Sequence, residues 1–426
     1  MSQLVARLMP LSLFAALATL LLGWLTATAQ SPAASKADWP QFRGPDRTNL
    51  SPDKNLLKKW PESGPKLLWK GQGVGIGFSS VAVAGDRVYT MGDKNGAAQI
   101  FALSRKTGKL LWGTPIGKAG GNYEGTRCTP TVEGDRVYGI GQFGDLVCLN
   151  ANTGKLIWRK NFLKDFGGRP GGWQFSESPT LDGDRLIVTP GGSKATVVAL
   201  DKKTGKEIWR NDAGYEAGYS TVVISNSCGV KQYVQLTAGG TIGVSAADGK
   251  TLWRYEKLGN NTANIPTPIV LGEQIFTSAG YGKGGALLTL SGDASSMTVK
   301  EEYYKGELRN KHGGILAVGD YIFGDTDDSG RPFCAEWKTG EIKWKRGGRG
   351  KGSGSASLTY ADGHLYIRYS DGYVVLVPAV PDGYKEVSSF KIPNSDTNSW
   401  AHPVVIGGRL YLREKDIVWC YDVSAQ

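Results

Sequence analysis

The sequence is poor in the residues from which many catalytic and metal centres are built. It has three histidines and four methionines among 426 residues. We find no pattern typical of a nucleophile elbow, a zinc-protease helix or a phosphate loop. So few histidines argue against a histidine-rich metal centre. The five cysteines are an odd number, which argues against a disulfide framework.

Long helical patterns are absent, and long apolar runs are almost absent. One apolar run, from Leu11 to Leu25, follows Arg7, which is the only charge in the first 35 residues. Ala27-Thr28-Ala29 then offers a cleavage site, so we predict a secretory signal peptide over residues 1–29. The alternative, an uncleaved membrane anchor, needs a longer run of about 20 apolar residues.

No second apolar run follows this segment, and no cysteine follows it closely enough to indicate a lipid anchor. We therefore predict a periplasmic or secreted protein with no transmembrane segment after signal cleavage. The chain has 50 Lys and Arg against 39 Asp and Glu, for a formal net charge of +11. Most of the basic residues are scattered at turns, which predicts a solvated surface and no nucleic-acid partner.

What the chain has in abundance is glycine, with 60 residues, and an internal repeat. The repeat reads Thr-Gly-Lys, two residues, then Trp, and it ends at Trp112, Trp158 and Trp209, with looser copies ending at Trp253 and Trp344. A Gly-Asp turn between apolar residues precedes each Trp, as at 84–89, 133–138 and 182–187. Such turns join hairpins, so each unit is predicted to hold four short strands, which is one propeller blade.

The spacing of the tryptophans gives the number of blades. Successive copies lie 46, 51 and 44 residues apart, and the last interval is 91, which leaves room for a blade whose outer strand ends near Tyr303. A seventh unit ends near Phe390, and an eighth stops after three strands at Tyr421. The segment from Lys66 to Trp69 has the outer-strand pattern without a preceding blade.

We therefore predict an all-β, eight-bladed β-propeller over residues 66–426, preceded by an N-terminal arm over residues 30–65. An N-terminal strand completes the last blade, which removes an exposed sheet edge. Seven blades is the alternative count. Each repeated Trp is interpreted as packing between blades, against the Thr-Gly turn of the next blade. Cys148, Cys334 and Cys420 share one repeat position and are interpreted as small buried residues.

The Ala-Leu-Asp-x-x-Thr-Gly-Lys-x-x-Trp element resembles the tryptophan-docking motif of pyrroloquinoline quinone (PQQ) propeller repeats, over residues 66–424. The segment from Asp38 to Pro45 also resembles the start of many exported PQQ-like proteins. The resemblance implies a superfamily that includes quinoprotein dehydrogenases and envelope assembly scaffolds of the BamB type. The dehydrogenases use a vicinal cysteine pair, calcium and an aspartate base, and this chain has no two adjacent cysteines.

In a propeller, the loops from one blade's outer strand to the next inner strand form a funnel rim, together with the turns between second and third strands. The predicted ligand-binding residues of the rim are Glu124, Arg127, Trp173, Glu177, Tyr219, Asn264, His312 and Trp400, with Tyr123, Gln174, Asn261, Lys311 and His402 as further rim residues. Their mixture of aromatic and charged side chains is typical of a pocket. The alternative is a polar channel mouth filled by water.

Two loops carry concentrated charge. Asp325, Asp327 and Ser329 fit the spacing of a calcium loop, because hard cations bind converging carboxylate oxygens. A charged hairpin turn is the alternative there. The segment 343–351 carries five positive charges on a glycine-rich connection, which fits either an acidic partner or a solvated loop.

The sequence is compatible with three functions. The leading hypothesis is an exported, non-catalytic propeller that binds a protein or another cell-envelope component at its funnel face, with no cofactor and no catalytic residues. The alternative is a PQQ-dependent dehydrogenase that oxidises alcohols or sugars and uses PQQ and calcium. A small-molecule or carbohydrate sensor is the third.

Overall fold

The structure is a computed structural model that describes residues 38–348, 350–395 and 398–425. The predicted signal peptide and the first residues of the predicted arm lie outside the described residues. The chain divides into two compact units, Met1–Pro32 and Ala33–Gln426, and everything below concerns the second unit.

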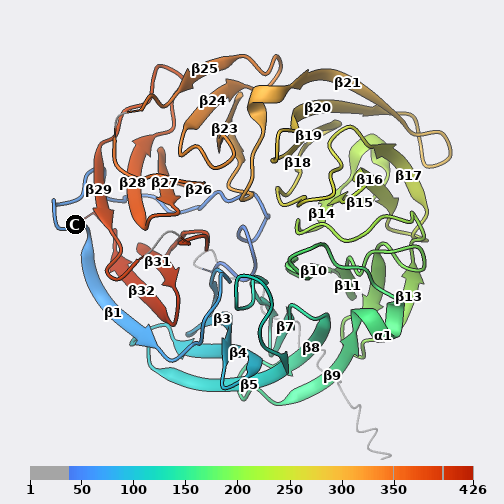
Figure 1. Ribbon diagram of the computed structural model, residues 1–426, viewed down its shortest axis with the longest axis horizontal. Coiled ribbons are helices and arrows are strands. Elements are labelled where there is room, and N and C mark those ends of the chain that lie inside the picture. The colour runs from blue at the N-terminus through green and yellow to red at the C-terminus, as the bar shows by residue number, and fades with distance from the viewer. Residues whose placement is uncertain (1–37, 349, 396–397, 426) are drawn as a thin grey trace, which may run out of the picture. The chain divides into compact units, whose positions relative to one another are not determined.

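The second unit consists of eight four-stranded antiparallel sheets arranged around a centre as blades of a propeller (Figure 1). Blades 1 to 4 contain β2 (Ala82–Ala84), β3 (Arg87–Lys94), β4 (Ala97–Ser104) and β5 (Leu110–Lys118); β6 (Thr131–Glu133), β7 (Arg136–Ile140), β8 (Asp145–Asn150) and β9 (Leu156–Asn161); β10 (Thr180–Asp182), β11 (Arg185–Val188), β12 (Val198–Asp201) and β13 (Glu207–Arg210); and β14 (Val223–Ser225), β15 (Gln232–Thr237), β16 (Gly240–Ser245) and β17 (Thr251–Tyr255).

Blades 5 to 8 follow the same order from the inner to the outer strand. They contain β18 (Ile269–Leu271), β19 (Gln274–Ala279), β20 (Gly284–Ser291) and β21 (Thr298–Lys305); β22 (Leu316–Val318), β23 (Tyr321–Asp325), β24 (Pro332–Glu336) and β25 (Ile342–Lys345); β26 (Ala356–Ala361), β27 (His364–Tyr369), β28 (Tyr373–Pro378) and β29 (Ser388–Lys391); and β30 (Val404–Ile406), β31 (Arg409–Glu414), β32 (Ile417–Asp422) and β1 (Lys66–Gln72). The predicted count of eight blades is confirmed.

Only short helical segments occur among the described residues. They are α1 (Phe162–Phe166), η1 (Ser227–Gly229) and η2 (Gly306–Leu308). The Asn161 side chain caps α1 by accepting hydrogen bonds from the backbone N–H groups of Leu163 and Lys164. No helix in the described part of the chain has the length and apolar character needed to cross a membrane.

The ring is closed by the N-terminal strand, as predicted. Strand β1 lies beside β32 (Figure 1) and pairs antiparallel with it. In this pairing Trp69 lies opposite Cys420. The indole N–H of Trp69 donates to the Arg105 carbonyl of blade 1, at 3.0 Å. The first and last parts of the propeller therefore share blade 8, and that shared blade docks on blade 1.

The repeated tryptophans join each blade to the next. Indole N–H groups donate to a carbonyl at the third-to-fourth-strand turn of the following blade, in the pairs Trp112–Ala151, Trp158–Lys202, Trp209–Ala246 and Trp344–Val380. Trp253 differs, because its indole donates to Gln232 within its own blade. In blade 5 the Tyr303 hydroxyl takes the same role and donates to the Trp337 carbonyl. Apart from the indole bond of Trp253, the repeated tryptophans thus link neighbouring blades, as the sequence predicted.

The cysteines also follow the prediction. All five are free, and Cys148, Cys334 and Cys420 are buried in the third or equivalent strand of their blades. Each of these three lies opposite the outer-strand tryptophan of its own sheet. They pack as small apolar residues and form no disulfide framework.

The arm that precedes β1 crosses the middle of the ring (blue in Figure 1). It starts beside blade 1, where Trp39 pairs with Val83, and it ends beside blades 7 and 8, where Leu56 pairs with Ser424. Between these points the Arg43 guanidinium donates to the carbonyls of Gly313 and Ile315, beside blade 6. The arm therefore blocks the channel that would otherwise pass through the propeller.

Candidate functional site

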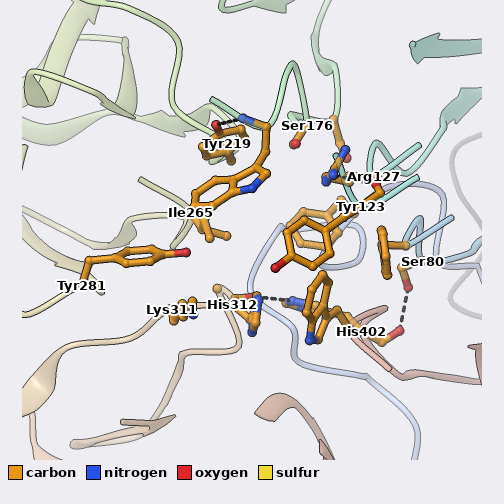
Figure 2. Close-up of a pocket in the computed structure, with 16 residues that line it drawn as sticks. Ser80, Tyr123, Arg127, Ser176, Tyr219, Ile265, Tyr281, Lys311, His312 and His402 are labelled. Atoms are coloured by element: carbon orange, nitrogen blue, oxygen red, sulfur yellow. Dashed lines mark hydrogen bonds between the residues drawn. The ribbon is translucent and has the colours of Figure 1, made fainter. Parts of the chain in front are cut away.

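The candidate site is a cavity of about 260 Å³ at the funnel mouth (Figure 2). Its lining consists of Phe42, Phe78, Ser80, Tyr123, Arg127, Trp173, Ser176, Ser178, Tyr219, Ile265, Tyr281, Lys311, His312, Gly313, Trp400 and His402. Phe42 belongs to the arm and Tyr281 to the turn between β19 and β20, while all the others lie in loops from an outer strand to the next inner strand. The cavity therefore gathers side chains from seven such loops.

The arm provides part of the inner end of this cavity. The Phe42 ring packs against the His402 ring at 4.9 Å, and both line the cavity. Next to Phe42, Arg43 is almost fully buried and anchored on blade carbonyls, as is Arg47, whose guanidinium donates to the Pro179 carbonyl at 2.9 Å. Because the arm fills the ring centre behind the cavity, a ligand has access from the funnel side.

Aromatic side chains form two groups in the wall. Trp400 stacks on His312 at 5.0 Å and also contacts Phe78 at 4.8 Å and Tyr123 at 5.3 Å. In the second group Trp173 stacks on Tyr281 at 6.1 Å and contacts Tyr219 at 6.3 Å. Aromatic faces of this kind bind flat apolar groups and exclude water from polar contacts beside them.

Two of the wall tyrosines lie on unfavourable backbone. Tyr123 has φ of +55° and Tyr281 has φ of +56°, in the left-handed region that bulky residues rarely adopt. Such a conformation costs on the order of 1–3 kcal/mol, and strained residues of this kind are common at binding and active sites. Tyr123 is also 51% exposed, so its ring is accessible at the rim.

Two cations line the cavity, and their surroundings differ. Lys311 pairs with Asp328 and lies 4.8 Å from the centre of the Tyr281 ring. The Arg127 guanidinium donates to the carbonyls of Asn122 and Tyr123 and forms no ion pair with any described residue. Partial burial lowers the pKa of Arg127, because desolvation disfavours the charged form. Arg127 is therefore the wall group best suited to an anion.

The two histidines of the cavity are neutral. Burial lowers the pKa of His402 to about 3 and lowers the pKa of His312 as well. His402 Nε2 lies 2.9 Å from the His312 carbonyl, which can only accept, so this nitrogen carries the hydrogen. His312 Nδ1 and Ser176 Oγ are buried with no hydrogen-bond partner among the described residues, so both remain available to a ligand.

The cavity contains five of the eight rim residues predicted to bind a ligand. Arg127, Trp173, Tyr219, His312 and Trp400 all line it, and so do the further rim residues Tyr123, Lys311 and His402. Glu124 lines a neighbouring cavity of about 350 Å³ together with Arg368 and Arg413. Whether any of these residues binds a ligand stays a prediction.

Glu177 and Asn264 are placed differently from the other predicted residues. Both are 2% exposed, and neither lines the cavity. The Glu177 carboxylate accepts from the Thr189 N–H, and the Asn264 side chain bonds to Asn260. Burial raises the pKa of Glu177 to about 8. These two side chains lie below the rim and hold its loops in place.

Several residues of the cavity were not predicted from the sequence. Phe42 lies in the arm, outside the repeat, and only the crossing of the arm brings it to the site. Phe78 lies in a loop from an outer strand to the next inner strand, and Tyr281 lies in a turn between second and third strands. Both therefore lie where rim residues were expected. Ser80, Ser176 and Ile265 are marked in the sequence only by their position in such loops.

The residues predicted as a calcium loop have other partners. Asp325 is fully buried and accepts from the Ala356 N–H, Asp327 pairs with Arg309, and Ser329 bonds to the Thr326 carbonyl. Within the described ranges no group of three or more His, Cys, Asp or Glu side chains is arranged to hold a metal ion. Calcium binding stays a prediction that this arrangement does not favour.

The basic segment 343–351 includes a buried arginine. Arg346 is 5% exposed, donates to the carbonyls of Gly330 and Gly352, and lies 5.0 Å from the centre of the Tyr369 ring. Lys343 pairs with Glu341. At least these two charges are used within the fold, which reduces the charge that this segment offers to an acidic partner.

The sequence and fold are similar to those of known propellers. A family model described as "Outer membrane protein assembly factor BamB" matches residues 61–138 and 99–346. Outer membrane protein assembly factor BamB of Burkholderia pseudomallei is 27% identical over 202 residues, which is 44% of this chain and 49% of that protein. The matched part therefore spans about half the length of that relative.

Quinoprotein dehydrogenases are similar as well. The quinoprotein ethanol dehydrogenase of Pseudomonas putida is 32% identical over 181 residues, which is 37% of this chain and 26% of that protein. The structure of a quinohemoprotein alcohol dehydrogenase, ADHIIG from Pseudomonas putida HK5, superimposes with a TM-score of 0.64 at 12% identity. The superposition covers 92% of this chain and 81% of the dehydrogenase. At 12% identity this likeness shows the fold alone.

Proposed function

Since the chain belongs to the family described as outer membrane protein assembly factor BamB, we propose that it is a non-catalytic binding propeller of the cell envelope. In this proposal it acts outside the cytoplasm and docks a protein partner at its funnel face. The signal peptide predicted over residues 1–29 is part of the same proposal. The similarity to BamB covers part of each chain, so the partner itself is not carried over from that relative.

The composition of the cavity carries this proposal. Its wall is mainly aromatic, and none of the described residues that line it is Asp or Glu. A side chain acting as general base has to lie within hydrogen-bond reach of the proton it removes. The histidines are neutral, but His402 is held by the arm and by the His312 carbonyl. The site is thus equipped to bind a group that enters it, and its described wall offers no carboxylate to act as acid or base.

The dehydrogenase alternative rests on the similarity to the quinoprotein enzymes. The residues present do not fit the calcium-assisted quinone site that the resemblance implies. The cavity wall supplies no carboxylate ligand for calcium and no aspartate base, and the chain has no vicinal cysteine pair. No residue of the cavity wall is therefore assigned a role in a redox step.

The binding proposal is tested by comparing funnel variants in the organism's own envelope. Tagged full-length chain is purified with its partners, alongside Tyr123→Ala and Trp400→Ala, which alter the cavity wall. Leu156→Ala on the outer strand β9 is the matched control, because the Leu156 side chain is 51% exposed, as is that of Tyr123. We expect the two funnel variants to lose a partner that the control retains, while all three keep the melting temperature of a folded ring. Equal recovery from all variants would rule out the funnel face.

Titration with PQQ and calcium separates the two functions. We expect no stoichiometric change in the absorbance of added PQQ and no reduction of an artificial electron acceptor when an alcohol is supplied. Stoichiometric PQQ binding with dye reduction would replace the binding proposal by the dehydrogenase.

A further inference from the structure

The chemistry of the cavity indicates which part of a partner would enter it, an inference that rests on the proposed function. Three features of the described residues define that chemistry. They are an arginine without a carboxylate partner, a wall of aromatic rings, and a closed inner end. Each of them restricts the occupant in a different way.

The arginine sets the charge of the occupant. Arg127 lines the cavity, and its guanidinium contacts only neutral groups, namely backbone carbonyls and the Phe78 ring at 5.7 Å. The Asp93 carboxylate acts on this charge electrostatically but forms no ion pair with it. A half-buried cation that lacks a paired carboxylate is costly, and an anion that binds it recovers part of that cost. The other cation, Lys311, is neutralised by Asp328. A positively charged group, such as a polypeptide N-terminus, is therefore disfavoured.

The walls and the volume set the shape. The cavity measures about 260 Å³, slightly below the roughly 300–1,000 Å³ typical of small-molecule pockets. Figure 2 shows the side chains of Arg127 and Tyr281 on opposite sides of the same space. A single ring would contact aromatic groups on both sides, and its anionic group would reach Arg127.

The closed inner end decides how a polypeptide can enter. Phe42 and the anchored Arg43 lie behind the cavity, so a chain cannot pass through the ring. Only a side chain or a chain end fits. An internal residue supplies either a ring or a carboxylate, whereas an aromatic residue at the C-terminus supplies both within one residue.

We propose that the funnel cavity binds the C-terminal aromatic residue of a partner polypeptide, with the free carboxylate on Arg127 and the ring among Trp173, Tyr281 and Trp400. His312 Nδ1 and Ser176 Oγ are buried polar atoms without a partner among the described residues, and both belong to residues that line the cavity. Capture of a chain end differs from binding along an extended surface, since it depends on the carboxylate itself.

The test uses full-length protein and fluorescent octapeptides of one composition. One peptide ends in phenylalanine with a free carboxylate, a second is its C-terminal amide, and a third carries the phenylalanine at an internal position. The free-acid peptide is expected to bind at least about tenfold more tightly than either of the others, as the loss of a charge-assisted hydrogen bond predicts. Equal affinity of the acid and the amide for the wild-type chain would overturn the proposal without any variant.

Two substitutions assign the effect to Arg127. Arg127→Gln is expected to bind the acid and the amide equally, whereas Arg159→Gln, an exposed arginine on β9, keeps the wild-type difference. A persistent difference in Arg127→Gln would overturn the assignment. N-acetylphenylalanine supplies the same chemistry as a small molecule, and affinity equal to that of the peptide would overturn the polypeptide source.

These outcomes are separate from those of the proposed function. If no peptide binds but partner recovery still depends on Tyr123 and Trp400, the funnel docks its partner by other means and only the capture of a chain end fails. If partner recovery is independent of the funnel, the proposed function fails first.

Discussion

At the scale of single residues, the arginines of the propeller have different tasks. Arg43 and Arg413 are enclosed by backbone carbonyls from separate parts of the ring and hold those parts together. Arg368 forms a buried ion pair with Glu414 at 2.7 Å. Arg127 contacts carbonyls of its own loop and faces the cavity. Arg127 differs from the structural arginines both in its partners and in its lower burial, and both differences leave it available for binding.

Asp325 gives a prediction about pH. Burial raises the pKa of this carboxyl to about 8, while the unfolded chain releases the proton near 3.8. Between these values the folded state holds a proton that the unfolded state has lost, so the contribution of Asp325 to stability falls as pH rises. Asp325→Asn cannot titrate, so its Tm relative to wild type should rise by about 2 °C or more between pH 4 and pH 8.

Calorimetric melting at the two pH values, with chelator and then with calcium, checks this. An identical pH dependence of wild type and variant would contradict the buried, protonated carboxyl. Stabilisation of the wild type alone by calcium would support the calcium loop predicted from Asp325, Asp327 and Ser329.

At the scale of elements, one contact is used repeatedly. The outer-strand rings lie over glycines of the next blade's turn, and a Cβ on Gly154 would come within 2.7 Å of the Trp112 ring. Gly154 also has φ of +71°, so glycine is needed there for two reasons. Because this spacing recurs in the sequence, the strands, the blade count and the closing strand were all predictable.

Gly154→Ala tests that contact. The substitution combines a left-handed backbone with a clash against Trp112, and we expect it to cost about 3 kcal/mol of unfolding free energy. Gly183→Ala is the matched control, since Gly183 has φ of +56° and a Cβ there meets no atom within 4 Å. We expect about 1 kcal/mol for the control, from the backbone alone. Urea unfolding measures both, and equal losses would contradict interblade docking at Gly154.

The site was less predictable than the strands, for reasons that can be stated residue by residue. Arg127, Trp173 and Trp400 were found because loop position alone places them at the rim. Glu177 was included by the same rule, but its side chain turns inward to Thr189, which no local pattern reveals. Phe42 was missed because the arm has no repeat partner, and its place depends on contacts with residues far away in the chain, such as those of Phe42 with His402 and of Arg43 with Gly313.

At the scale of the whole molecule, two segments from the N-terminal side complete the propeller. Strand β1 supplies the outer strand of blade 8, and the arm fills the ring centre. Together they leave the ring without an open sheet edge at its closure and make the funnel a cavity closed at its inner end. The same segments thus stabilise the fold and shape the site.

A pair of truncations tests this dependence. Removal of residues 1–72 takes away the arm and β1 and exposes the edge of β32, and we expect loss of cooperative unfolding and aggregation. A chain that starts at Asp38 keeps both segments and should unfold at the same urea concentration as the full chain. Unchanged unfolding of the shorter chain would contradict closure through β1.

The central claim is that the funnel mouth is the binding face, and site-specific photo-crosslinking in intact cells tests it most directly. A photoreactive residue replaces Tyr123 at the exposed rim, or Lys203 in the β12–β13 turn, which lies at the opposite face because antiparallel strands alternate in direction. The account predicts one defined adduct from position 123 and none from position 203. A defined adduct from position 203 alone would contradict it.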